Sequence, residues 1–334
     1  MDLIIKPTQK CNFCCDFCSS NNIDSSGNNI LPLESVYSLL KQNNIDSLII
    51  NGGDPLMMPP KYYFDIINFI KDNNLNTKLS FTTNLWDFYI NPDKWTPLFK
   101  NDRVRVATSF QYGNGRKIKP FGNKKTVTIF SEEIFTKVMN LFKEKIGYVP
   151  IFISVITNDN EDKVIDTVLL AKKLKTKCKI NPVVKSGRSS EYYPTWKAYQ
   201  KYLEIIELGL TEYEFNATIL KEVLENKNHT CPYCRNCWQS IRAIGPNKIL
   251  HSCGAYEDDY LANIKQNKKT YDLINYRPKQ ILIDHRSLKK DCFACQLFPL
   301  CNSCFKRMND MMEDNAIEDH CSHMKSMIQR FNKL

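Results

Sequence analysis

Alternation of short apolar runs with amphipathic helical patterns is the feature that most constrains the fold of the first 210 residues. Apolar runs of four to six residues predict strands at Leu3–Lys6, Ser47–Asn51, Lys78–Thr82, Arg103–Thr108, Ile151–Ile156 and Cys178–Pro182. A helical period of apolar residues follows each run, at Leu33–Lys41, Lys61–Lys71, Pro92–Phe99, Glu132–Lys145, Lys163–Leu174 and Thr195–Leu208. Repeated βα units of this length predict an α/β fold with a parallel sheet, either open and doubly wound or a partial barrel.

The pattern changes after about residue 212, where the strand–helix alternation stops. Nine of the 14 cysteines fall between Cys231 and Cys321. We therefore predict a barrel-like domain at residues 1–210, a bridging helix at 211–230 and a cysteine-rich domain at 231–334.

The N-terminal segment MDLIIKPTQKC has too short an apolar run for a signal peptide, and no segment approaches the roughly 18 apolar residues of a membrane span. We therefore expect a cytoplasmic protein without membrane attachment. Disulfides are rare in that compartment, so clustered cysteines indicate metal binding or catalysis.

A first group of cysteines, CNFCCDFC, lies at residues 11–18, directly after the first predicted strand. Two interpretations compete. Cys11, Cys14, Cys15 and Cys18 form two CxxC pairs that could bind one zinc ion. Alternatively, Cys11, Cys15 and Cys18, in a CxxxCxxC spacing, could bind three irons of a [4Fe–4S] cluster and leave the fourth iron open.

The CxxxCxxC spacing, with the aromatic Phe17 before its last cysteine, resembles that of the radical SAM superfamily. The resemblance implies a partial (β/α)6 TIM-like barrel with the cluster loop after its first strand. Gly52, Gly53, Asp54 and Pro55, after the second predicted strand, resemble the GGEP motif of the family with Asp in place of Glu. In the family the backbone of this motif binds the amino group of S-adenosyl-L-methionine (SAM), and glycine permits that close approach.

Polar residues at the ends of the later predicted strands are further candidates for SAM contacts. By resemblance these are Asn84, Ser109, Gln111, Thr157 and Arg188. Ligands at the carboxyl ends of the strands are the rule for such barrels. Many relatives have Ser-x-Asp where this chain has Ser109 and Gln111, and ordinary loop positions are an equal alternative for each of these residues.

The C-terminal cysteines have a spacing that resembles the SPASM domain of peptide-modifying radical SAM enzymes. Three departures are visible: Lys248 stands where Gly is usual, the interval from Cys301 to Cys304 is one residue short, and Cys234 is an additional thiol.

By position, the resemblance implies two auxiliary [4Fe–4S] clusters in this domain, which makes three clusters in all. Their ligands would be Cys231, Cys237, Cys253 and Cys304 for the first, and Cys292, Cys295, Cys301 and Cys321 for the second. Cys234 could replace Cys304. The rival interpretation is a pair of zinc sites that include His320 or His323. Cys14 and Cys178 are expected not to bind metal.

The resemblance implies one-electron chemistry on a peptide. A reduced cluster cleaves SAM to methionine and a 5′-deoxyadenosyl radical, which abstracts hydrogen from an unactivated carbon. Oxidation would then give a thioether, a carbon crosslink or a formylglycine-type carbonyl on a precursor peptide. An electron donor of the flavodoxin or ferredoxin type is an expected partner. Because ten residues precede Cys11, we expect leader recognition to come from a separate protein or from the barrel surface, or not to be needed.

The formal net charge of +10 leaves a second class of substrate open. A basic surface suits an acidic peptide or RNA, and a radical SAM enzyme acting on RNA or a small molecule is the alternative. However, eleven thiolates on three clusters would lower the charge to about +5, so nucleic acid is the less favoured partner. A zinc-binding interaction module is the non-enzyme alternative.

Overall fold

The computed structural model describes residues 1–20, 30–120, 125–225, 240–251, 254, 262–263, 294–301 and 304–333. Within these residues one sheet has the strand order β11-β10-β9-β1-β2-β3-β4-β7-β8. Six of its strands pair in parallel in chain order: β1 (Asp2–Ile5), β2 (Ser47–Ile50), β3 (Lys78–Thr82), β4 (Val104–Ser109), β7 (Ile151–Ile156) and β8 (Cys178–Pro182). These confirm the six predicted strands to within one residue at either end.

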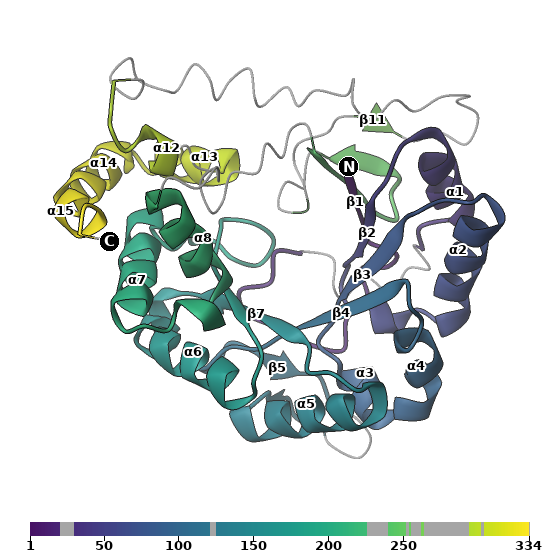
Figure 1. The fold of residues 1–334 in the computed structure, drawn as a ribbon. Coiled ribbons are helices and arrows are strands. Elements are labelled where there is room, and N and C mark those ends of the chain that lie inside the picture. Colours follow the sequence, from purple (N-terminus) through teal and green to yellow (C-terminus); the bar gives the residue numbers. More distant parts are fainter. Residues whose placement is uncertain are drawn as a thin grey trace.

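The connecting helices cover the outer side of the curved sheet, so that the six strands form a partial barrel (Figure 1). They are α1 (Leu33–Gln42), α2 (Pro60–Asp72), α3 (Trp86–Ile90), α4 (Pro92–Phe99), α5 (Glu132–Ile146), α6 (Val164–Lys173) and α7 (Thr195–Glu207). The predicted partial (β/α)6 barrel is therefore confirmed. The short helix α3 was not predicted.

Local sequence explains where the helices begin and end and which side they bury. Helix α5 begins after Ser131, whose side chain accepts a hydrogen bond from the amide of Ile134, and ends at Gly147 with φ +100°; these are typical capping residues. In α2 the buried residues recur with helical spacing, as at Ile66, Ile67 and Ile70. Burying each such side chain contributes about 1.5–3 kcal/mol to folding.

A buried carboxylate fixes helix α8 (Phe215–Leu224) to the last barrel strand. Glu214 precedes the helix and accepts hydrogen bonds from the amides of Ile180, at 2.8 Å, and Ala217. Asn216 donates to the carbonyl of Ile180 at 2.7 Å. Burial raises the pKa of Glu214 to about 7, against the lowering effect of these hydrogen bonds.

The sheet continues into the cysteine-rich part of the chain. Strand β9 (Ile241–Ile244) pairs in parallel with β1, and β10 (Ile249–His251) and β11 (Ala262–Asn263) extend it antiparallel. None of these strands was predicted from the sequence. The barrel sheet thus crosses the sequence boundary proposed at residue 231.

The C-terminal helices are α12 (Phe298–Cys301), α13 (Phe305–Glu313), α14 (Ile317–Ser326) and α15 (Ile328–Phe331), drawn in yellow beside α7 in Figure 1. Tyr199 of α7 donates a hydrogen bond to the carbonyl of Leu300 at 2.6 Å, and Glu207 pairs with Arg330 at 2.9 Å. Among the helices that can be described, none combines the length and the apolar character required to span a bilayer.

Candidate functional site

Three of the first four cysteines meet at one cavity. Cys11, Cys15 and Cys18 lie in the loop after β1 and line a cavity of about 310 Å³, whereas Cys14 does not belong to its lining. In the described part of the chain, no three Cys, His, Asp or Glu side chains converge as ligands of a single ion do.

The environment of two of these thiols, Cys11 and Cys18, favours their neutral form when no metal is bound. Burial, together with the charge of Asp54, raises the pKa of Cys11, although its sulfur accepts a hydrogen bond from the amide of Phe13 at 3.3 Å. Burial also raises the pKa of Cys18. A bound metal centre would change this balance, because it takes up the thiolate form directly.

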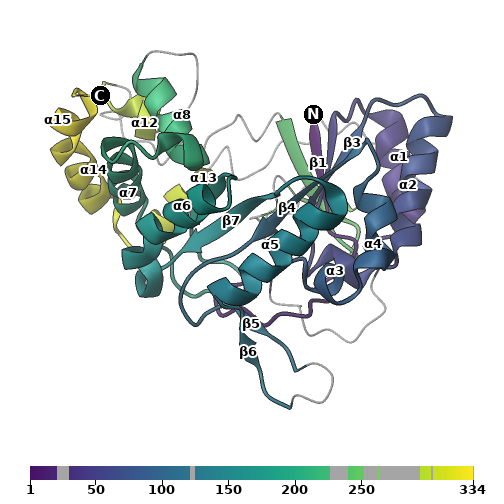
Figure 2. The ribbon, with the colours of Figure 1, turned by 60° about the horizontal axis from the view of Figure 1, so that its bottom comes forward.

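A β-hairpin clamps the cluster loop from outside. Its strands are β5 (Lys117–Ile118) and β6 (Thr128–Ile129), and Figure 2 shows the hairpin projecting from the barrel beside the N-terminal segment in purple. The amide of Cys14 donates to the carbonyl of Lys117 at 2.8 Å, and the amide of Lys119 donates to the carbonyl of Asn12 at 2.9 Å. The hairpin therefore fixes the backbone on which the three cysteines stand.

Gly52 and Gly53 pack against the backbone that leads into the cluster loop. A Cβ atom on Gly53 would lie 2.2 Å from the carbonyl oxygen of Lys10 and 2.4 Å from that of Gln9. Gly52 has φ +136°, and a Cβ there would lie 2.5 Å from the carbonyl oxygen of Thr8. Glycine is required at both positions because no side chain fits between the two segments.

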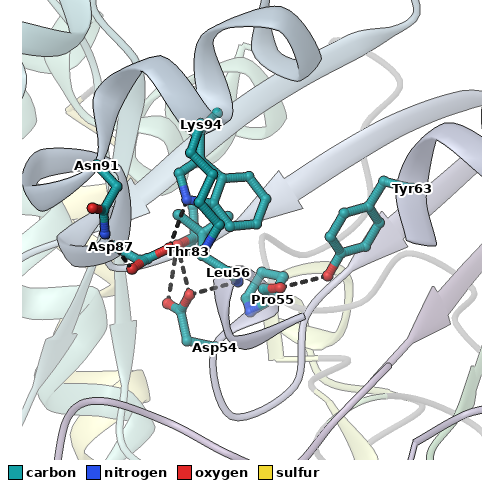
Figure 3. Close-up of polar contacts among 9 residues, drawn as sticks. Asp54, Pro55, Leu56, Tyr63, Thr83, Asp87, Asn91 and Lys94 are labelled. Carbon is teal, nitrogen blue, oxygen red and sulfur yellow. Dashed lines mark hydrogen bonds and ion pairs between the residues drawn. The ribbon is translucent and has the colours of Figure 1, made fainter. Parts of the chain in front are cut away.

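Asp54 fastens this turn to the end of β3 (Figure 3). Its carboxylate accepts hydrogen bonds from the amide of Leu56 at 2.9 Å, from the hydroxyl of Thr83 at 3.0 Å and from the amide of Asn84 at 2.8 Å. Burial raises its pKa to about 6, although these donors lower it. The acidic residue of the motif therefore holds two strand ends together through its side chain.

Two other predicted residues line the same cavity. Asn84 donates a hydrogen bond to the side chain of Asn12 at 2.7 Å and accepts one from the amide of Trp86 at 2.8 Å. It thereby connects the end of β3 to the cluster loop. Ser109, the last residue of β4, accepts a hydrogen bond from Arg116 at 2.9 Å.

Arg116 is a charged cavity residue that was not predicted from the sequence as part of the site. Its side chain is 6% exposed, lies 5.4 Å above the ring of Phe17 and has no hydrogen-bond partner at Nε. A buried guanidinium with unused donors is costly unless an anion satisfies it. The available signal was a single arginine within a glycine-rich loop, which the sequence analysis treated as part of the general positive charge.

Four predicted SAM contacts lie outside the cavity lining. Pro55 is buried at the start of a 3₁₀ turn, the side chain of Gln111 is buried with its Oε1 unpartnered, and Thr157 begins a second 3₁₀ turn. Arg188 is exposed, and its amide donates to the carbonyl of Cys18 at 2.8 Å. Contacts between these residues and SAM therefore stay predictions.

Only some of the cysteines predicted to bind the auxiliary clusters lie in the described residues. Cys231, Cys234, Cys237, Cys253 and Cys292 lie outside the described residues. Those that can be described, Cys295, Cys301, Cys304 and Cys321, are half-buried. Both auxiliary ligand sets therefore stay predictions.

The similar proteins cover nearly the whole chain. The cysteine-type anaerobic sulfatase-maturating enzyme of Clostridium novyi (strain NT) is 24% identical over 368 aligned positions, which cover 99% of this chain and 95% of that protein. Native anSMEcpe with bound AdoMet (SAM) and Cp18Cys peptide superposes with a TM-score of 0.69 at 18% identity, covering 99% of this chain and 97% of that one. Streptococcus suis SuiB bound to precursor peptide SuiA gives a TM-score of 0.61 at 17% identity, covering 91% and 72%.

The sequence profile of the Radical SAM superfamily matches residues 5–171, which is half of the chain. This segment contains the cluster loop, the Gly52–Asp54 turn and Arg116, and thus most of the described cavity wall. The likeness to the solved structures independently supports the same fold. The chain therefore belongs to the radical SAM superfamily and is an enzyme that uses SAM and a [4Fe–4S] cluster.

Proposed function

We propose that this enzyme modifies a peptide: it abstracts a hydrogen atom from a carbon of a ribosomally made peptide and leaves an oxidative modification such as a thioether or a carbon crosslink. The observation that carries the proposal is that Cys11, Cys15 and Cys18 line one cavity together with the turn Gly52–Asp54 and the buried Arg116. Its volume of about 310 Å³ is within the range of small-molecule sites.

The residues of this cavity fit the two groups that the family uses. In the proposal, Cys11, Cys15 and Cys18 bind the cluster, and the strand ends from Gly52 to Ser109 surround SAM. Arg116 binds the carboxylate of SAM, which satisfies the Nε atom that lacks a partner in the protein. Together the two groups supply a carbon radical when bound, while the protein orients them and excludes water.

We further propose two auxiliary [4Fe–4S] clusters in a SPASM-like domain at residues 231–334, with a bridging helix at 211–230 and the barrel at 1–210. The cysteine spacing of the C-terminal part supports them. A contact between the C-terminal part and the barrel supports the proposal that the two parts act together. Arg307 of α13 donates a hydrogen bond to the carbonyl of Pro182 at 3.0 Å, and Pro182 lines the cavity.

A peptide substrate is supported by two similar structures, anSMEcpe with Cp18Cys peptide and SuiB with precursor peptide SuiA. The similarity to a cysteine-type sulfatase-maturating enzyme favours one second candidate, the oxidation of a cysteine residue within a protein to a carbonyl. A separate leader-recognition protein and an electron donor of the flavodoxin or ferredoxin type complete the proposal.

The test begins with protein prepared without oxygen, which should contain about twelve irons per chain if three clusters are present. The reduced protein is then given SAM, and 5′-deoxyadenosine is measured. Co-expression with short peptides encoded beside the gene follows. Loss of two hydrogen atoms with sulfur retained indicates a crosslink, whereas loss of two hydrogen atoms together with replacement of sulfur by oxygen indicates the second candidate. An unchanged mass for every such peptide, with modification of RNA or a small molecule instead, would contradict the peptide proposal.

A further inference from the structure

The cluster loop has two sides, of which the site uses only one. Cys15 faces the cavity, whereas the next residue toward the N-terminus, Cys14, is half-exposed outside it. We use the name outer face for the surface formed by Cys14, Asp16, Lys117, Lys119 and Arg188. On this side the backbone of the loop is paired with the edge of the hairpin through the hydrogen bond from the amide of Cys14 to the carbonyl of Lys117.

The outer face is basic. Backbone hydrogen bonds place three cationic residues along the loop. The carbonyl of Lys117 accepts a hydrogen bond from the amide of Cys14 at 2.8 Å, the amide of Lys119 donates to the carbonyl of Asn12 at 2.9 Å, and the amide of Arg188 donates to the carbonyl of Cys18 at 2.8 Å. Asp16 offsets part of this charge, because it pairs with Lys117 at 2.6 Å.

The hairpin adds apolar surface beside these cations. Val127 is 51% exposed and Ile129 is 44% exposed, and Lys125 next to them is also exposed. A small apolar area within a charged rim is typical of weak, short-lived protein contacts, which bury less than about 1,200 Å². In such contacts, charge complementarity governs the rate of encounter more than the affinity.

We infer that the outer face is the docking surface for an acidic electron-carrier protein. The inference rests on the proposed function, because it requires a cluster at Cys11, Cys15 and Cys18. The reduced carrier gives up one electron, which the cluster accepts, and the carrier leaves oxidised by one electron. No atom is transferred. Docking here leaves the cavity side free for SAM and substrate, so that reduction does not require either to leave.

The test uses charge reversal at two lysines that the site does not use. The variant Lys119→Glu/Lys125→Glu changes one lysine of the outer face and the exposed lysine of the hairpin beside it. The control Lys41→Glu/Lys71→Glu makes the same change in net charge on α1 and α2, which lie away from the hairpin (Figure 2). The rate of 5′-deoxyadenosine formation is measured against the concentration of a reduced flavodoxin, and separately with dithionite, a small reductant. Binding of oxidised flavodoxin is measured by calorimetry, which does not depend on SAM cleavage.

We expect the outer-face variant to lower the second-order rate constant with flavodoxin about tenfold at low salt, within the range of electrostatic steering. The difference should shrink to less than about twofold near 0.5 M salt, where charges are screened. Rates with dithionite should equal those of the wild type, and the control variant should behave as wild type with both reductants.

Equal rates of the two variants with flavodoxin, or an equal loss with dithionite, would overturn the inference, as would unchanged flavodoxin binding. A wild-type protein that forms no 5′-deoxyadenosine with dithionite would contradict the proposed function instead. The two failures are therefore distinguishable.

Discussion

The substitution Gly53→Ala tests the interpretation that the glycine turn positions the cluster loop. The added Cβ would lie 2.2 Å from the carbonyl oxygen of Lys10 and 2.4 Å from that of Gln9, whereas carbon and oxygen normally approach no closer than roughly 3.3 Å. Relief of the clash requires a shift of about 1 Å in residues 8–10, the segment that carries Cys11.

That shift breaks two backbone hydrogen bonds, from Gly53 to the carbonyl of Thr8 at 3.0 Å and from Asp54 to that of Lys10 at 2.8 Å. Each contributes about 0.5–1.5 kcal/mol, and overpacking costs about 1–3 kcal/mol more. We therefore expect the free energy of unfolding to fall by about 2–6 kcal/mol. The variant should also lose about four irons per chain, those of one cluster.

The assay is urea unfolding together with iron content after anaerobic reconstitution. The matched control is Gly245→Ala, because a Cβ there would lie 3.5 Å from its nearest neighbour, which is an ordinary contact. The control should retain wild-type iron and nearly wild-type stability. Wild-type stability and full iron content in Gly53→Ala would refute the reasoning.

Two further predictions concern buried charges. Arg116→Ala should weaken SAM binding about 10- to 100-fold in equilibrium dialysis, because a hydrogen bond to a charged group contributes about 1.5–3 kcal/mol; decarboxylated SAM should bind variant and wild type equally, and an equal loss for both ligands would contradict a carboxylate contact. Because the pKa of Glu214 is raised from 4.5 to about 7 in the folded state, its stabilising contribution is complete below pH 4.5 and is lost as the pH rises to 7. The free energy of unfolding should therefore fall by up to about 3 kcal/mol across this window, and urea unfolding at pH 5 and pH 8 should show this difference in the wild type but not in Glu214→Gln.

The sequence predicted the barrel strands well because buried parallel strands and amphipathic helices have distinct periods. It missed β9, whose residues Ile241–Ile244 lie among the cysteines without a following helix that would mark a βα unit. Only the parallel pairing with β1 reveals its place.

Site residues on the strands or in the cluster loop could be predicted from the sequence. Residues in the loops after the strands and in the hairpin were harder to predict. Ser109 ends β4 and lines the cavity, but the chain turns after it, so the alternation of the strand no longer places Gln111 on the same face. Arg116 reaches the cavity only because the hairpin folds back on the cluster loop. That long-range contact leaves no periodic signal in the sequence.

The most direct measurement of the central claim is the amount of 5′-deoxyadenosine formed from SAM by dithionite-reduced protein. The account assigns Cys15 to the cluster and places Cys14 outside the cavity. It predicts that the wild type and Cys14→Ala form the product at similar rates and that Cys15→Ala forms none. Equal loss in both variants, or no product from the wild type, would contradict it.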